Sequence, residues 1–86
     1  MIVRLADSVT VWMEHGVPAR IVWQGRRYRV SDRPTPIRES VDVPAMTHPL
    51  DKLVGYRMQV TDEEEHSIVV DVYGTGTTAR LVAVYD

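Results

Sequence analysis

The sequence predicts a small all-β domain of five or six antiparallel strands, arranged as a meander that closes into a partly open SH3-like barrel. Apolar and polar residues alternate in several short runs, as in strands that bury one face. Turn segments with Gly, Asp or Glu separate these runs at hairpin spacing. The two features together favour a barrel in which consecutive strands are neighbours.

Length and composition limit the class of protein. A chain of 86 residues predicts one β domain, residues 1–86, with a single modest core. Because the sequence has no Cys, disulfides and thiolate metal sites are excluded, which suits a cytoplasmic protein. The first residues lack the apolar run of a signal peptide, and no segment approaches the roughly 18 apolar residues of a membrane span. We therefore expect a soluble protein with no membrane partner.

The segment Ala19–Val30 predicts a β-hairpin around which the rest of the chain is organised. A two-residue turn at Gln24-Gly25 gives Gly the positive φ that tight hairpin turns need. This turn sets Ile21 opposite Tyr28 on an apolar face, with Trp23 near the turn. We expect both aromatic residues to lie in the core, where such side chains stabilise most, rather than to stack on bases.

The other face of this hairpin is rich in arginine, because the same register sets Arg20 opposite Arg29. Like charges directly opposite destabilise a sheet by roughly 0.2–1 kcal/mol. The candidate contacts to an anion or a nucleic acid are Arg20, Arg26, Arg27 and Arg29. The alternative is that these arginines extend into water or pair with carboxylates from elsewhere in the chain.

The segments on either side of the hairpin predict different structures. The alternation in Val9–Met13 predicts the first strand. Between Arg33 and Leu53, four prolines exclude a long helix or a central strand, so we expect an irregular connection at about residues 33–53. Within it, Thr47 predicts the cap of a single helical turn over residues 47–53.

The last third predicts a three-stranded meander. A loop at Asp62–His66 sets Met58 opposite Val70, and a turn at Thr75-Gly76 sets Val70 opposite Leu81. The same registers place Asp71 between Arg57 and Arg80 as a structural ion network, and Gly55 beneath Tyr73. The predicted core is Val11, Ile21, Trp23, Tyr28, Val30, Met58, Val60, Ile68, Val70, Val72 and Leu81.

The sequence contains only weak matches to metal-binding, phosphate-binding and catalytic motifs. Asp62–His66 is the one cluster resembling a metal site, but adjacent loop residues point in different directions, so a solvated acidic turn is preferred. Gly74–Thr78 lacks the Gly-Lys-Ser/Thr of a phosphate loop. No catalytic triad is recognisable, and His48 is the least implausible base. We predict a non-enzyme with no cofactor, no metal and no catalytic residue.

Two terminal motifs carry a resemblance. Trp23–Val30 reads Trp-Gln-Gly-Arg-Arg-Tyr-Arg-Val, and Arg80–Asp86 reads Arg-Leu-Val-Ala-Val-Tyr-Asp. Together they resemble a small, mainly actinobacterial domain of unknown function, a related segment of which lies C-terminally in proteins similar to Y-family DNA polymerases. The middle of the chain does not share this resemblance. The resemblance of the two motifs implies a setting in DNA replication or repair, and it implies no catalytic residue.

We therefore expect a non-catalytic interaction or accessory module with a protein partner, associated with DNA repair or replication proteins. One alternative is a nucleic-acid-binding β module that uses the arginine-rich hairpin, although a net charge of −2 disfavours strong non-specific binding. A weaker alternative, by association only, is a nucleotidyltransferase-like enzyme. The sequence leaves the oligomeric state open.

Overall fold

All regular elements that the structure describes are β-strands. The computed structural model describes residues 1–41 and 50–85. Its strands are β1 (Ile2–Glu14), β2 (Val17–Trp23), β3 (Arg26–Val30), β4 (Thr35–Val41), β5 (Leu50–Asp62), β6 (Ser67–Tyr73) and β7 (Arg80–Tyr85). No helix in these ranges is long and apolar enough to cross a membrane. The prediction of an all-β fold is confirmed.

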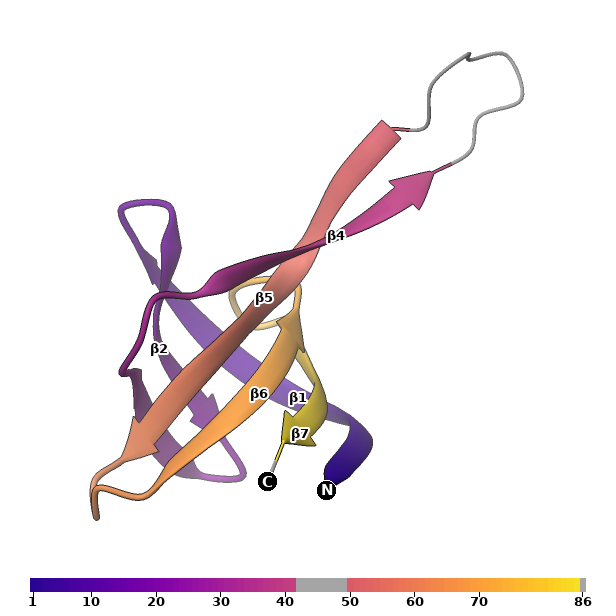
Figure 1. Ribbon diagram of the computed structural model, residues 1–86. Helices are drawn as coiled ribbons and strands as arrows, with labels where there is room; N and C mark the ends of the chain where they lie inside the picture. Colours follow the sequence, from indigo (N-terminus) through magenta and orange to yellow (C-terminus); the bar gives the residue numbers. More distant parts are fainter. Residues whose placement is uncertain (42–49, 86) are drawn as a thin grey trace.

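The strands form an antiparallel meander that closes on itself. Their order is β3-β2-β1-β7-β6-β5-β4, and an additional β3–β5 pairing closes the ring of all strands except β4 (Figure 1). Every pairing is antiparallel. Consecutive strands of the ring are neighbours, which matches the predicted small barrel.

The two long strands each serve two neighbours. The first half of β1 pairs with β7 and the second half with β2. The first part of β5 pairs with β4, and its last residues pair with β3. Figure 1 shows the consequence, since β4 and the start of β5 leave the barrel together as an arm.

The prediction of an irregular connection over residues 33–53 is wrong in part, because β4 and the start of β5 lie within it. The prolines excluded a central strand, whereas β4 has β5 as its one sheet neighbour, and an edge strand accommodates Pro36. Residues 50–53 are strand rather than helical turn. The predicted cap Thr47 and the candidate base His48 lie outside the described residues, as do Pro44 and Pro49.

Two of the three predicted hairpin registers are confirmed. Ile21 lies opposite Tyr28 in β2–β3, and Met58 lies opposite Val70 in β5–β6. The β6–β7 register is wrong, because Leu81 lies opposite Val72 and not opposite Val70. The connection from Tyr73 to Arg80 is longer than a two-residue turn, and a shift between Asp71 and Val72 then changes the register again.

The core fills the barrel from all six ring strands. Its fully buried members include Ile21, Met58, Val60, Val70, Val72 and Leu81. Of the other predicted core residues, Val11 and Tyr28 are buried, whereas Trp23, Val30 and Ile68 are partly buried and pack against the cluster. A core of this kind leaves the outer surface of each strand to carry polar side chains, arginine among them.

Candidate functional site

Two tight turns shape the surface of β1, β2 and β3. His15-Gly16 joins β1 to β2, and Gln24-Gly25 joins β2 to β3. All four residues have positive φ, between 52° and 82°, which is the conformation of hairpin turns that match the twist of the strands. The predicted turn at Gln24-Gly25 is therefore confirmed, and both registers are fixed.

These registers align side chains in rows across the outside of the barrel. Trp12 lies opposite Arg20, and Arg20 lies opposite Arg29. In the next outer row, Val22 lies opposite Arg27. Arg26 lies opposite Trp23, in a row that belongs to the inner face, so it projects at the rim of the barrel rather than beside the other three arginines.

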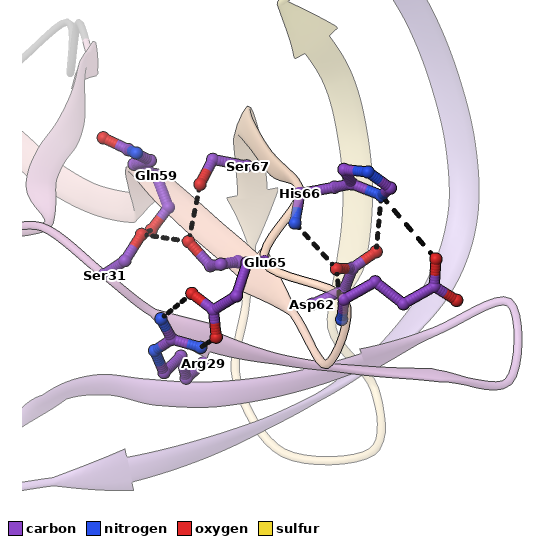
Figure 2. A network of polar contacts seen from close by, with 9 residues as sticks. Arg29, Ser31, Gln59, Asp62, Glu65, His66 and Ser67 are labelled. Atoms are coloured by element: carbon purple, nitrogen blue, oxygen red, sulfur yellow. Dashed lines mark hydrogen bonds and ion pairs between the residues drawn. The ribbon is translucent and has the colours of Figure 1, made fainter.

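Arg29 is paired with the acidic turn of the β5–β6 hairpin. Its Nη1 and Nη2 donate hydrogen bonds to the two carboxylate oxygens of Glu65 at 3.1 and 2.8 Å, the bidentate arrangement seen in Figure 2. The guanidinium lowers the pKa of Glu65, and the carboxylate raises the pKa of Arg29. This pair is solvent-exposed on both sides, so it neutralises charge without adding much stability.

Arg26 is paired with Asp62 of the same turn. Its Nη1 donates to Oδ2 of Asp62 at 3.2 Å. Oδ1 of Asp62 accepts hydrogen bonds from the backbone N–H groups of Glu64 and His66, both at 2.9 Å (Figure 2). The His66 amide contributes most to lowering the pKa of Asp62 and outweighs burial, which acts in the opposite direction. Asp62 therefore organises the turn and engages a hairpin arginine at once.

Arg20 and Arg27 have no carboxylate partner among residues 1–41 and 50–85. The Arg20 guanidinium lies over the ring of Trp12, with its Cζ atom 6.0 Å from the ring centroid. Trp12 itself is 43% exposed, so part of a large aromatic ring is accessible to a ligand. For Arg27, the described part of the chain supplies no hydrogen-bond, ion-pair or ring partner.

The surface around these residues is concave. An open groove of about 500 Å³ has Trp12, Arg20, Val22 and Arg27 in its lining. Two smaller hollows of about 230 Å³ adjoin Arg27 and include Asp62 and Glu63. We call the outer surface formed by Trp12, Arg20, Val22 and Arg27 the Trp12 face. It combines an aromatic ring, an aliphatic side chain and two cations, and acidic residues border one side.

The second arginine-bearing surface lies on β5, β6 and β7. Arg57 donates to the two carboxylate oxygens of Asp71 at 2.8 and 3.1 Å, and the Tyr85 hydroxyl donates to Asp71 at 2.6 Å. Arg57 also stacks on the Tyr85 ring, with 4.5 Å between Cζ and the centroid. We call these three residues the Asp71 cluster.

Electrostatics in the Asp71 cluster favour the ionised carboxylate. Burial alone would raise the pKa of Asp71, but hydrogen bonds from Arg57 and Tyr85 outweigh burial and hold this pKa below its ordinary value. The same contacts raise the pKa of Arg57 and of Tyr85. The predicted Arg57–Asp71 pair is thus present, whereas Arg80 lies opposite Tyr73 and donates to the backbone carbonyl of Ala6.

The acidic groups on the part of the chain that the structure describes do not form a metal site. No cluster of three or more His, Asp or Glu side chains there has the arrangement to hold a metal ion. The acidic turn uses Asp62 and Glu65 for contacts with arginine, which leaves it poorly arranged to ligate a cation. Asp71, the one carboxylate inside a predicted strand of the last third, is occupied by Arg57 and Tyr85.

Sequence reasoning did not place Trp12 on the outer surface, and it did not place Tyr85 beside Asp71. Trp12 occupies an outward position of an alternating run whose inward residues are Val9 and Val11. That alternation is readable from the sequence and is the signal that separates Trp12 from Trp23. Tyr85 had no such signal, because its position depends on a register that a long connection sets.

Comparison of the chain with protein-family models, with curated proteins and with solved structures finds no match.

Proposed function

We propose that this protein is a non-catalytic interaction module that binds a protein partner through the Trp12 face. The observation that carries the proposal is an exposed tryptophan on β1 beside Arg20 of β2, with Arg27 next in line on β3. Neither arginine has a carboxylate partner among the described residues. Trp and Arg are the side chains most enriched among residues that dominate protein–protein binding energy. An exposed Trp is otherwise unfavourable, because its ring loses the stabilisation that burial would give.

The ion pairs of Arg26 and Arg29 favour a protein partner over a nucleic acid. Arg26 and Arg29 are neutralised by Asp62 and Glu65, so two of the four predicted anion contacts are already occupied. Glu63 also lines a hollow next to Arg27 and would repel a continuous chain of phosphates. A protein segment carries discrete charges and can avoid this repulsion.

A nucleic-acid-binding role is the second candidate, and Trp12 is the observation that favours it. An exposed aromatic ring beside Arg20 and Arg27 is the combination on which bases of a single strand stack while phosphates contact the cations. This candidate now rests on Trp12, Arg20 and Arg27 instead of on four arginines.

The resemblance of Trp23–Val30 and Arg80–Asp86 to a segment of Y-family polymerase-like proteins suggests where to look for the partner. We propose a replication or repair assembly as its setting, by analogy with that segment. Fold alone does not assign a partner, so the proposal rests on the surface and not on the barrel.

Photo-crosslinking tests the proposal. Benzoylphenylalanine replaces Trp12 in one variant and the exposed Arg80 in a matched control, and each is irradiated in an extract of the source cells. We expect a discrete adduct from position 12 that a nuclease leaves unchanged and whose digest contains peptides of a second protein, with no such adduct from position 80. An adduct that a nuclease shortens would support the second candidate. Equal adducts from both positions, or none from position 12, would refute binding through the Trp12 face.

A further inference from the structure

The two arginines of the Trp12 face have a defined spacing. Arg20 lies directly opposite Arg29, and Arg27 is two residues from Arg29 on the same strand and the same side. Arg20 and Arg27 are therefore diagonal neighbours on β2 and β3, a spacing of about 7–8 Å between the two residues. Both line the groove and one of the two smaller hollows, so a single ligand segment can reach both.

An extended peptide has a matching repeat. Side chains at positions i and i+2 lie on the same side of an extended chain, about 6.6–7 Å apart. Two carboxylates at these positions can therefore face Arg20 and Arg27 together. The next side chain on that side, at i+4, lies beyond Arg20 toward Trp12, because Trp12 and Arg20 are direct neighbours across β1 and β2.

The chain itself shows how this hairpin takes a carboxylate. Arg29 holds Glu65 in a bidentate pair, although both side chains are more than half exposed. Arg20 and Arg27 lie on the same outer surface and present the same guanidinium group without such a partner in the described ranges. The apolar part of the groove, made by Trp12 and Val22, offers the contact that distinguishes a peptide side chain from a free anion.

From this geometry we infer the chemistry of the partner, an inference that rests on the proposed function. The Trp12 face binds an extended peptide segment of the pattern acidic–x–acidic–x–apolar. The two carboxylates pair with Arg20 and Arg27, and the apolar side chain packs against Trp12. Because the acidic turn borders the groove, a segment with spaced charges fits better than a continuous polyanion.

The test measures binding of defined fluorescent peptides to the full chain by anisotropy at low salt. The probe carries Glu, Glu and Leu at alternate positions with Ser between them. A permuted peptide of identical composition places the two Glu residues next to each other, and a third peptide carries Gln for Glu. We expect the probe to bind at least about fivefold more tightly than either control, because the permuted Glu side chains point to opposite sides.

Matched variants of the protein locate the site. Arg20→Gln, Arg27→Gln and Trp12→Ala are each expected to weaken probe binding by about fivefold or more. Arg80→Gln removes the same charge from an exposed position on β7 and is expected to change affinity less than about twofold. Equal losses in Arg27→Gln and Arg80→Gln would overturn the inference, because attraction would then be non-specific.

Two further outcomes separate this inference from the proposed function. Failure of the probe to bind, or displacement of the probe by an oligothymidylate more readily than by unlabelled peptide, would overturn the acidic-peptide inference. If the probe fails to bind, a protein adduct from position 12 in the crosslinking experiment would still support the proposed function. Loss of that adduct together with preference for the oligonucleotide would overturn both and favour nucleic acid.

Discussion

The Trp12 face and the Asp71 cluster are both outer surfaces of the barrel that carry arginine, and they differ in what the arginines contact. In the Asp71 cluster, Arg57 has a carboxylate, a hydroxyl and an aromatic ring as partners. On the Trp12 face, the described ranges supply an aromatic ring as the one partner of Arg20 and no partner for Arg27. Within those ranges, one surface satisfies its own charges and the other does not.

This difference is the ground on which we propose a binding role for Arg20 and Arg27 and a structural role for Arg57. A charge that the fold satisfies has its interactions already made, so it stabilises and offers little to a ligand. A cation beside an exposed aromatic ring has interactions still to make, which is the property of a binding surface. Counting arginines in the sequence does not distinguish the two cases, whereas their partners do.

The two tryptophans give the largest expected contrast. Trp23 packs against the core and its Nε1 donates to Asp7 at 3.0 Å, so Trp23→Ala should destabilise the fold by about 3 kcal/mol. Trp12→Ala should cost only about 1 kcal/mol, because Trp12 lies on the outer surface and is 43% exposed. Chemical denaturation measures both. Equal costs would erase the distinction between the inner and outer tryptophan.

Gly55 tests the packing beside the Asp71 cluster. It lies opposite Tyr73, and a Cβ atom there would lie 2.0 Å from the backbone oxygen of Val72. Gly55→Ala should therefore displace β6 and destabilise by about 2 kcal/mol. Thermal unfolding measures the loss, with Gln59→Ala on the same strand as control. A Gly55→Ala variant as stable as that control would show that β5 and β6 adapt freely.

Asp71→Asn tests whether the Asp71 cluster is structural. Loss of the charged hydrogen bonds should cost about 1–2 kcal/mol at neutral pH, since Arg57 is half exposed and partly solvated. Because folding lowers the pKa of Asp71, its contribution is full above the unfolded-state pKa and disappears as pH falls through the folded-state pKa.

The free energy of unfolding, measured as a function of pH in acid, tests this direction of the pH dependence. Asp71→Asn should lose less stability than the natural protein on acidification below about pH 4, while Asp62 and Glu65 retain their own acid dependence in both. Identical acid profiles for the two proteins would show that Asp71 contributes nothing through its charge.

Arg27→Gln gives the smallest expected effect on stability. The guanidinium has no partner among the described residues, so its removal should change the free energy of unfolding by less than about 0.5 kcal/mol. A measured loss above about 1 kcal/mol would show that Arg27 is engaged within the fold, and it would remove Arg27 from the Trp12 face.

The sequence was sufficient for the barrel because short turns determine registers. Gln24-Gly25 leaves one register that keeps Ile21 and Tyr28 on the same side, and the structure has that register. It was insufficient for β6–β7, where the connection between Tyr73 and Arg80 allows several registers with the same apolar face. The placement of Arg80 beside Asp71 failed for that reason.

The sequence predicted which arginines of the candidate site face outward, but not which of them have carboxylate partners. Alternation placed Arg20, Arg27 and Arg29 on the outer face, as observed. Which arginines keep a carboxylate partner depends on the β3–β5 pairing that brings Glu65 and Asp62 to the hairpin, and this contact joins segments more than thirty residues apart. Local pattern carries no information about such a contact, so the distinction between Arg29 and Arg27 came from the structure.

The central claim is that the Trp12 face binds an acidic peptide segment of a protein partner. The two indole N–H resonances report on it directly in ¹H–¹⁵N spectra, since Trp12 lies on the proposed face and the Trp23 indole is bonded to Asp7. On titration with the acidic–x–acidic–x–apolar peptide, the account predicts a progressive shift of the Trp12 resonance and a stationary Trp23 resonance. A stationary Trp12 resonance with the peptide at saturation would contradict it.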